Sequence, residues 1–486
     1  MSRIHFAVFL ACAFACTDET EPPPQAATND PNEVVLEDDA SGVELELNIG
    51  GVDREARTAL SGGATTIFKD DADAFETPAP NLSGDHLERH EVGDEGFGRA
   101  HVAGAGDGTN GGLGPVFDNE SCEACHLGDG RGRPPLPGEA FSSMLFRSSV
   151  TGSDANGGPL GIPAGFGGQL QMRAIAGYQA DIQAAVTYVE SRGTFADGTE
   201  FQLHVPQYTL TGMYPGLPAS YLFSPRVAPP VFGLGLLEAI PELLIRARSD
   251  PRDFNRDGIS GRANTVYDAV RKRHALGRFG WKANTPNLFQ QSAGAYNGDM
   301  GVTSDLFPGE SCAGRLDASC NDAHGPEVNA QTVADVAFYT QTLGVPARRN
   351  LNDPTARRGE LLFYASGCDG CHTPTLRTGF LRGVPEVSNQ VIHPYTDLLV
   401  HDMGPGLADG RPDFQASGSE WRTPPLWGIG LVETVNGHTR FLHDGRAYSL
   451  LEAVLWHGGE ATRARDRVRH LTQPDRDALI AFLKSL

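Results

Sequence analysis

Two stretches of the chain read Cys-x-x-Cys-His: Ser121-Cys122-Glu123-Ala124-Cys125-His126 and Gly367-Cys368-Asp369-Gly370-Cys371-His372. Two cysteines three positions apart can each form a thioether with one vinyl group of a haem, and the histidine that follows is then held under the iron as its proximal ligand. The motifs therefore predict two covalently bound c-type haems. The attachment residues are Cys122, Cys125 and His126 for the first haem, and Cys368, Cys371 and His372 for the second.

Two other chemistries also use paired cysteines. A zinc site built from two Cys-x-x-Cys pairs keeps them about 15–20 residues apart, whereas most of the protein separates these two motifs. A thioredoxin-type dithiol needs a βαβ context and has no use for a histidine after both pairs. Haem attachment is the interpretation that uses the cysteines and the histidines together.

Length and charge narrow the class of protein. A chain of 486 residues is long enough for two or three domains with cores of their own. The net charge of −22 argues against nucleic acid as a partner, because phosphates attract basic surfaces. An acidic surface favours a basic redox partner instead.

The first sixteen residues have the pattern of a signal peptide. Arg3 precedes an apolar run over residues 6–15, which is too short to span a bilayer but has the length of a signal-peptide core. We therefore expect export to the periplasm or the cell envelope. Small residues stand before Cys16, so a bacterial lipoprotein with a lipid on Cys16 is also expected as an alternative, although Phe14 is bulky for such a cleavage site.

Residues 17–63 are rich in Asp, Glu, Pro, Ala and Gly. Such a composition buries little apolar surface, so we expect an acidic, disordered linker there. Of the eight cysteines, four are assigned to haem and two to the signal segment. The remaining two, Cys312 and Cys320, are eight residues apart in a loop, which predicts a local disulfide in an oxidising compartment, with two free thiols as the alternative.

Helical periodicity indicates an internal repeat. Residues 355–364 carry apolar positions at helical spacing before the second motif, and residues 329–343 and 472–486 form two similar amphipathic segments. We expect a mainly α protein with two cytochrome-c-like domains, over residues 64–345 and 346–486. The first would hold a mixed loop and β insertion over about 150–325, with a strand near 202–210. This insertion would shape substrate access or serve as a structural cover.

Six further stretches carry a resemblance to a known group of proteins. The chain resembles the bacterial di-haem oxidoreductases described as thiol oxidoreductases or peroxidases and, more distantly, the di-haem cytochrome c peroxidases and the related enzyme that matures methylamine dehydrogenase. The resemblance extends from about residue 60 to the end of the chain. The stretches are 224–230, 233–241, 277–281, 299–301, 401–404 and 442–446.

This resemblance implies three catalytic residues. In the peroxidases a tryptophan lies between the haems, a glutamine follows ten residues later, and an acidic residue precedes Met-Gly. Trp281, Gln291 and Asp299 match that order, although the family's acid is usually Glu and lies two residues further on. A carboxylate can move a proton between the two oxygens of peroxide, and an amide can orient peroxide. Without the resemblance, Asp299 would be interpreted as a turn residue and Trp281 as core.

The resemblance also implies a distal ligand for the second haem. His457 stands about fourteen residues after the His443-Asp444-Gly445 turn, where the relatives place this ligand. A second histidine would give a lower potential than a His/Met pair. Met403 is the rival ligand, and a helix C-terminal histidine stabilised by the helix dipole is the structural alternative for His457.

The distal face of the first haem has fewer candidates. No histidine lies between residues 127 and 203, which suggests an iron open to peroxide, although His86, His90 and His101 remain possible ligands. Separately, Asp253, Asn255 and Asp257 precede Gly258 with the spacing of a calcium loop, but the twelfth position is Asn264 instead of Glu. Calcium and a plain turn rich in Asp and Asn both remain open.

Together these features predict a di-haem peroxidase-type enzyme. Hydrogen peroxide would be reduced at the haem on His126, with electrons passing from the haem on His372 through Trp281. A small cytochrome or cupredoxin would supply the electrons. The alternatives are a di-haem electron-transfer cytochrome without substrate chemistry, and an oxidase of a thiol or protein substrate.

Overall fold

The computed structural model describes residues 52–104, 112–315, 320 and 325–486. Helices account for 28% of the chain and strands for 20%, distributed over many small sheets. The prediction of a mainly α protein is therefore wrong. The predicted signal peptide and the linker up to residue 51 lie outside the described residues. Residues 51–486 form one compact unit.

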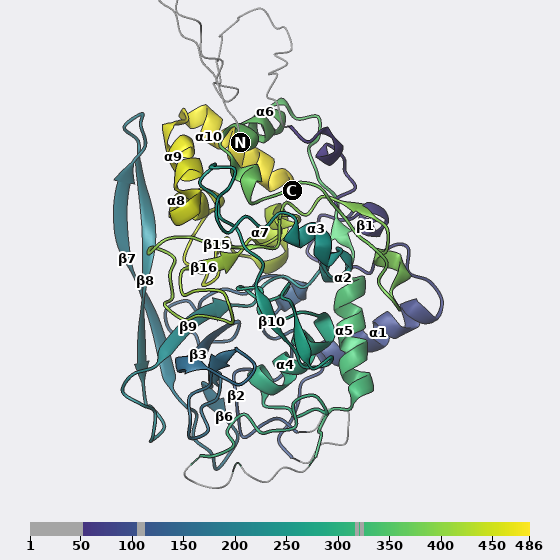
Figure 1. The fold of residues 1–486 in the computed structure, drawn as a ribbon, viewed down its shortest axis with the longest axis vertical. Coiled ribbons are helices and arrows are strands. Elements are labelled where there is room, and N and C mark those ends of the chain that lie inside the picture. The colour runs from purple at the N-terminus through teal and green to yellow at the C-terminus, as the bar shows by residue number, and fades with distance from the viewer. Residues whose placement is uncertain (1–51, 105–111, 316–319, 321–324) are drawn as a thin grey trace, which may run out of the picture. The chain divides into compact units, whose positions relative to one another are not determined.

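The helices are named in chain order, as labelled in Figure 1. They are α1 (Asp85–Gly98), α2 (Leu234–Ala239), α3 (Glu242–Arg246), α4 (Leu288–Met300), α5 (Ala330–Thr342), α6 (Pro354–Ala365), α7 (Val432–Asn436), α8 (Leu450–Trp456), α9 (Thr462–His470) and α10 (Gln473–Ser485). The three helices expected from periodicity correspond to α6, α5 and α10, so these predictions are confirmed.

Side-chain caps explain where the predicted helices begin. Asn329 accepts a hydrogen bond from the Thr332 amide at the start of α5, and Thr472 accepts one from the Asp475 amide at the start of α10. At α6, Asp353 caps the helix and Pro354 occupies its first turn. These residue types satisfy the free amides of a first helical turn, which is why the boundaries follow from the sequence.

Two helix pairs repeat the same packing in the two halves of the chain. Helix α1 crosses α5, and α6 crosses α10. At the first crossing, a Cβ on Gly93 would overlap the carbonyl oxygen of Asp335; at the second, a Cβ on Gly359 would overlap that of Ala478. Glycine is needed at both crossings because the backbones approach too closely for a side chain.

The strands form six two-stranded sheets and one four-stranded sheet among the described residues. The four-stranded sheet joins β3 (Met144–Ser153) to β4 (Pro159–Leu160), β5 (Gln169–Leu170) and β9 (Leu222–Val227). The longest hairpin pairs β7 (Gln183–Thr194) with β8 (Glu200–Thr211), as Figure 1 shows. The strand expected at 202–210 lies within β8 and is confirmed.

The other ladders are short. They pair β1 (Thr66–Ile67) with β12 (Val345–Pro346), β2 (Val116–Phe117) with β6 (Arg173–Ala174), β10 (Thr265–Asp268) with β11 (Arg273–Leu276), β13 (Leu376–Arg377) with β14 (Val391–Ile392), and β15 (Val400–Asp402) with β16 (Glu420–Arg422). Strands of two to four residues are too short for a visible period-2 pattern. They pair because buried connecting segments must satisfy their backbone N–H and C=O groups, and this raised the strand content above the expectation.

Three clusters of buried apolar side chains organise the core. The first is built from α1, α2, α4 and α5, and Cys122 packs against it. The second is built from α6, α8 and α10, and Cys368 packs against it. Trp281, Trp421 and the side chains of β3 form the third, where Met403 is a partly buried member. Each Cys-x-x-Cys-His motif thus packs against its own cluster of apolar side chains.

The domain boundaries stay predictions. Strand β12 lies at the expected boundary near residue 345 and pairs in parallel with β1, at the expected start of the first domain. Residues 52–63, at the end of the expected linker, include fully buried Ala56 and the ion pair between Arg57 and Glu360. Within the described part of the chain, none of the helices is both long and apolar enough to cross a bilayer.

Candidate active site and haem-attachment residues

The first Cys-x-x-Cys-His motif folds into a tight turn. The amides of Cys125 and His126 both donate to the carbonyl of Cys122, at 3.1 and 2.9 Å. The Nδ1 atom of His126 lies 2.7 Å from the carbonyl oxygen of Pro229. Since only a protonated Nδ1 can donate there, the Nε2 atom keeps its lone pair. Burial lowers the pKa of His126 to about 4, so the imidazole is neutral, as a metal ligand must be.

The second motif repeats this arrangement. The amide of His372 donates to the carbonyl of Cys368 at 3.0 Å, and its Nδ1 atom lies 3.0 Å from the carbonyl oxygen of Tyr395. Burial, together with the proximity of the His457 imidazole, lowers the pKa of His372 to about 4. The second motif therefore also presents a neutral imidazole with a free Nε2 lone pair.

The residues of both motifs fit a haem. All four motif cysteines are free thiols, and both histidines have the tautomer that an iron ligand requires. Beside the first motif, the buried hydroxyl of Tyr296 has no hydrogen-bond partner in the described structure. An unsatisfied buried hydroxyl costs about 1–3 kcal/mol. A further group in this space would remove that cost, which is consistent with a cofactor at the first motif.

Asp299 lies close to the first motif. It is near the C-terminal end of α4, and its backbone carbonyl accepts hydrogen bonds from the amides of Asp118 and Asn119, at 2.8 and 3.2 Å. These two residues immediately precede the haem motif. Burial raises the pKa of Cys125 to about 12, and the charge of Asp299 raises it further. The structure thus brings this predicted acid to the haem-attachment cysteines.

Gln291 lies near the other end of the same helix. It is eight residues before Asp299 in α4, which places it about 12 Å away along the helix axis at a rise of ~1.5 Å per residue. The two predicted catalytic residues therefore share a helix without being adjacent. The role of Gln291 stays a prediction.

A different glutamine contacts Asp299. The Nε2 atom of Gln169, on β5, lies 2.9 Å from Asp299 Oδ1 and 2.8 Å from Asp118 Oδ2. Neither Gln169 nor Asp118 was predicted from the sequence. The one available signal was the pair of glutamines on either side of Leu170, because polar residues flanking a buried apolar one are typical of a strand that lines a polar site.

Trp281 connects the surroundings of the two motifs. Its indole Nε1–H donates to the carbonyl of Val227 at 2.8 Å, two residues before the Pro229 carbonyl that holds His126. Its own carbonyl accepts a hydrogen bond from the amide of Arg422 at 2.8 Å. The charge of Asp397 acts on the Arg422 guanidinium.

The path continues to the second motif through His401. Asp397 bonds His401 Nε2 at 2.8 Å, and Cys371 Sγ lies 3.5 Å from His401 Nδ1. Trp281 is therefore linked to the surroundings of the second motif through Arg422, Asp397 and His401. Its role between the haems stays a prediction.

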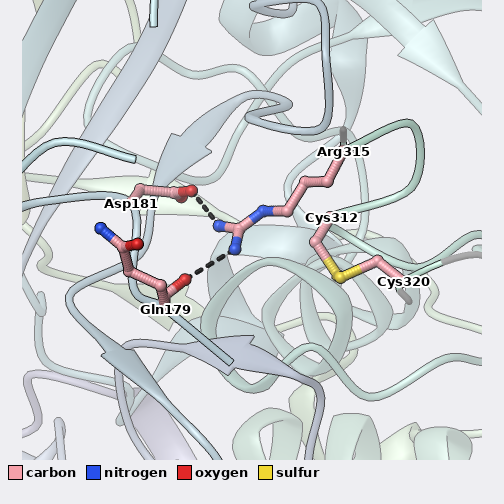
Figure 2. The surroundings of a disulfide bond; sticks show 5 residues. All are labelled: Gln179, Asp181, Cys312, Arg315 and Cys320. Atoms are coloured by element: carbon pink, nitrogen blue, oxygen red, sulfur yellow. Dashed lines mark hydrogen bonds and ion pairs between the residues drawn. A yellow bond between two sulfur atoms is a disulfide. The ribbon is translucent and has the colours of Figure 1, made fainter. Parts of the chain in front are cut away.

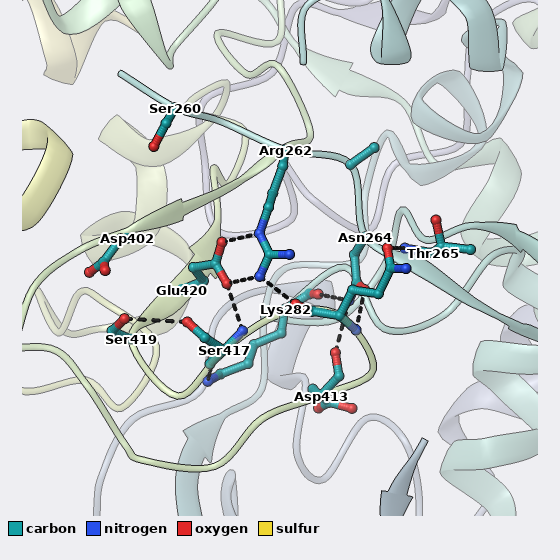
Figure 3. Close-up of polar contacts among 12 residues, drawn as sticks. Ser260, Arg262, Asn264, Thr265, Lys282, Asp402, Asp413, Ser417, Ser419 and Glu420 are labelled. Atoms are coloured by element: carbon teal, nitrogen blue, oxygen red, sulfur yellow. Dashed lines mark hydrogen bonds and ion pairs between the residues drawn. The ribbon is translucent and has the colours of Figure 1, made fainter. Parts of the chain in front are cut away.

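The residue after Trp281 anchors this loop. The Lys282 ammonium donates to Asp409 Oδ1 and to the carbonyls of Arg411 and Ser417, each at 2.8 Å. Figure 3 shows Lys282 beside the ion pair between Arg262 and Glu420. Lys282 is fully buried. A buried ammonium with three acceptors fixes the backbone of its neighbours, so the position of Trp281 is held from the second half of the chain.

His457 is close to His372. A proton on either imidazole would disfavour one on the other, which adds to the effect of burial on the pKa of His372. The Nδ1 atom of His457 lies 2.7 Å from the carbonyl oxygen of Ala453, one turn earlier in α8, so its Nε2 lone pair is also free. Burial lowers the pKa of His457. His372 and His457 thus share the features expected of two axial ligands.

Met403 lies near His457 along the backbone, because its carbonyl oxygen is next to Gly458. Its side chain belongs to the cluster with Trp281 and Trp421, whereas Cys368 packs in the cluster of α6 and α10. Its amide donates to the carbonyl of Ser419 at 3.0 Å. Both distal-ligand assignments stay predictions.

The three histidines considered for the first haem have partners of their own. His86 Nδ1 lies 2.7 Å from Glu386 Oε1, and His90 Nδ1 lies 2.8 Å from Thr342 Oγ1. The ring of His101 packs edge-on against Tyr296 at 5.5 Å between centroids. Of the three, His101 therefore lies beside Tyr296, whose hydroxyl has no hydrogen-bond partner in the described structure.

The predicted disulfide is present. Cys312 and Cys320 are bonded, with their Cα atoms 5.6 Å apart, and both are buried. Figure 2 shows the bond next to Arg315, whose guanidinium donates to the Gln179 carbonyl at 2.6 Å and forms an ion pair with Asp181. The disulfide closes its own loop, and Arg315 connects that loop to the segment around Gln179 and Asp181.

The predicted calcium residues form a hydrogen-bonded turn. Asn255 Nδ2 donates to Asp257 Oδ2 at 2.8 Å, and the Gly258 amide donates to Asp253. The twelfth residue, Asn264, donates to the carbonyls of Lys282 and Asp413. Among the described residues, no group of three or more His, Cys, Asp and Glu side chains is arranged to hold a metal ion. Calcium stays a prediction.

These features suit a di-haem redox protein. Each motif has a buried, neutral histidine and a pair of thiols beside its own helix pair, and Trp281 is linked to the surroundings of both. A family model described as "Di-haem oxidoreductase, putative peroxidase" matches residues 56–486. The match covers most of the chain, so the protein belongs to this family of di-haem oxidoreductases. No curated protein and no solved structure matches it.

Proposed function

We propose that the protein is a c-type di-haem peroxidase that reduces hydrogen peroxide at the first haem. The observation that carries this proposal is the pair of acids beside the first motif: the Asp299 carbonyl accepts from the amides of Asp118 and Asn119, and the Asp299 carboxyl group acts on Cys125, whereas His457, a buried histidine with a lowered pKa, acts on His372 of the second. An acid beside one iron suits peroxide chemistry, and two strong ligands on the other suit electron supply.

Each motif holds its haem through two thioethers and one histidine. Cys122 and Cys125 attach the first haem and His126 ligates its iron; Cys368, Cys371 and His372 do the same for the second. When bound, the first haem supplies the iron that receives peroxide and the electrons that cleave its O–O bond. Two electrons and two protons convert one peroxide into two waters.

The protein side chains move protons and orient peroxide. The Asp299 carboxylate accepts a proton from one peroxide oxygen and returns it to the other. Gln291 orients peroxide through its amide. Trp281 provides the route for electrons between the two sites, and His457 completes the ligands of the second haem, with Met403 as the alternative.

The surroundings of the enzyme follow from its sequence. The signal pattern supports export to the periplasm or the cell envelope. A lipid on Cys16 would in addition tether the protein to a membrane. The net charge of −22 supports a basic small cytochrome or cupredoxin as the electron donor. Calcium at Asp253, Asn255 and Asp257 would stiffen the loop that lies over the second motif, where Ile259 approaches Gly370.

The test is a peroxide titration of the purified holoprotein and of an Asp299→Ala variant. We expect the parent to consume peroxide with a change in its haem absorption, and the variant to react about 10²-fold or more slowly, as is typical of a lost general acid–base group. Asn297→Ala is the matched control, because Asn297 lies on the same helix and bonds only the Gly309 carbonyl.

Two outcomes would favour the alternatives. If the parent fails to react with peroxide in both its oxidised and half-reduced states, and both haems stay low-spin, the protein is an electron-transfer cytochrome. If peroxide is inert but a dithiol or a protein substrate reduces the first haem, the protein is an oxidase of that substrate.

A further inference from the structure

The carboxyl groups of Asp118 and Asp299 are neighbours inside the protein. One atom, Gln169 Nε2, lies 2.8 Å from Asp118 Oδ2 and 2.9 Å from Asp299 Oδ1. The two residues are far apart in the chain, and Gln169 comes from a third segment, β5. Two carboxyl groups that meet at one amide nitrogen form a pair whose protonation states depend on each other.

The orientation of the Gln169 amide follows from its other contacts. Arg147 Nη1 donates to Gln169 Oε1 at 3.0 Å. Since a guanidinium can only donate, the oxygen end of the amide must face Arg147, and the nitrogen end must face the two carboxyl groups. The same nitrogen is 3.0 Å from the Gly298 carbonyl, so its two N–H bonds are shared among three acceptors. The nitrogen end of Gln169 therefore faces both acids as a donor.

Asp118 and Asp299 differ in their surroundings. Asp118 is 2% exposed, whereas Asp299 is half-buried. Burial and the negative charge of Asp299 raise the pKa of Asp118 well above its usual value. The Met172 amide, which donates to Asp118 Oδ1 at 3.0 Å, and the Gln169 amide act in the opposite direction without reversing the shift. Burial also raises the pKa of Asp299, but the Gln169 hydrogen bond and the charge of Arg147 lower it. The proton of the pair therefore belongs on Asp118.

Other charges around the pair do not reverse this order. Asp181 adds a negative charge that acts on Asp118, and its own carboxylate is paired with Arg315. Arg173 lies on the far side of Asn119, to which it donates at 3.3 Å. The motif thiols Cys122 and Cys125 become neutral thioethers once haem is attached. The cation that acts directly on Asp299 is Arg147, which favours an ionised Asp299.

We propose that Asp118 and Gln169 are positioning residues for Asp299: Asp118 holds the single proton of the pair, while the Gln169 amide keeps Asp299 ionised and oriented. This inference rests on the proposed peroxidase function, in which an ionised Asp299 accepts the peroxide proton. Asp299 returns that proton within the same turnover, so the pair starts and ends each cycle with one proton.

The first experiment locates the proton by infrared spectroscopy of the holoprotein. A protonated carboxyl has a C=O stretching band that is separate from carboxylate bands and shifts in deuterated water. Other buried acids such as Asp129 contribute to the same region, so the variants are compared by difference spectra. We expect Asp118→Asn to remove one component of the band at neutral pH. We expect Asp299→Asn to keep that component with a midpoint at lower pH, because the negative charge of Asp299 raises the pKa of Asp118. A component that persists in Asp118→Asn, or that Asp299→Asn removes over the whole pH range, would overturn the proposal.

The second experiment follows the pH dependence of kcat/KM for peroxide. Removing the amide in Gln169→Leu takes a hydrogen bond from the ionised form of Asp299, so its pKa rises. The acid limb of the profile should move up by about one pH unit, with an approximately tenfold loss of kcat/KM on that limb. Gln171→Leu is the matched control, because Gln171 Nε2 donates to the same Gly298 carbonyl but to neither acid.

The role of Gln169 and Asp118 and the peroxidase function can fail independently in these experiments. Equal pH profiles for Gln169→Leu and Gln171→Leu would overturn the role of Gln169, even in an active peroxidase. If the parent fails to turn over peroxide, the proposed function fails, yet the infrared bands still decide which acid holds the proton. Should Asp118→Asn not fold, the band in Asp299→Asn makes the same decision.

Discussion

The two haem motifs use the same local chemistry in different surroundings. In both, the histidine Nδ1 atom donates to a backbone carbonyl, and a pair of helices crosses at a glycine. They differ in the side chains that approach from elsewhere in the chain. Asp299, Gln169 and Asp118 gather at the first motif, whereas His457 approaches the second. A repeated scaffold can thus carry two different functions, because the differences come from the segments outside the repeat.

We expect the largest effect from variants that lose one of the two haems, because they test whether the two sites have different roles. We expect Cys122→Ser with Cys125→Ser to abolish covalent haem at the first site, and Cys368→Ser with Cys371→Ser to abolish it at the second. Haem staining and the iron content of each variant measure this, with a fall from two haems to one.

The same variants assign the peroxide chemistry. The protein that lacks the first haem should lose the peroxide reaction completely. The protein that lacks the second should still react with peroxide after chemical reduction, while accepting electrons poorly from a donor protein. The reverse result would exchange the roles of the two sites.

A smaller effect is expected from the distal ligand of the second haem. Replacing His457 with Met should raise the midpoint potential of that haem on the order of 0.1 V, within the ~0.8 V range that axial ligands span, because thioether ligation favours the reduced iron. Met403→Leu should leave the potential unchanged. Redox titration measures both, and a shift caused by Met403→Leu alone would identify Met403 as the ligand.

A still smaller effect, on stability, is expected from substitutions at the two helix crossings. Gly93→Ala and Gly359→Ala should each destabilise the protein by about 1–3 kcal/mol, since an added methyl group overpacks a close helix crossing. Chemical denaturation of the holoprotein measures this. Gly309→Ala is the control, because a Cβ there meets no atom within 4 Å. A neutral result at one crossing only would mean that the two helix pairs are less alike than their geometry suggests.

The helices and the disulfide could be predicted because their signals are local. Asn329, Asp353 and Thr472 cap helices that the periodicity had located, and Cys312 and Cys320 are only eight residues apart. The short strands could not be predicted, since a ladder such as Thr66–Ile67 with Val345–Pro346 joins residues from distant parts of the chain. Their pairing depends on the satisfaction of buried backbone groups, which no local pattern records.

The candidate site was predicted in part. The sequence located both Cys-x-x-Cys-His motifs, and the resemblance pointed to Trp281 and Asp299, whose roles stay predictions. The resemblance also offered Gln291 as the amide that orients peroxide, but Gln291 lies eight residues before Asp299 on α4. The amide that reaches Asp299 comes from Gln169, on a strand of the insertion.

The prediction of covalent haem attachment needed nothing beyond the sequence. Two Cys-x-x-Cys-His motifs carry all their reactive atoms within a few residues, so their spacing suffices to predict haem. Only the tertiary structure decided which groups surround each motif. Asp118, Gln169 and Asp299 lie on three separate segments, and the energy of a buried charge depends on the neighbours that folding brings together.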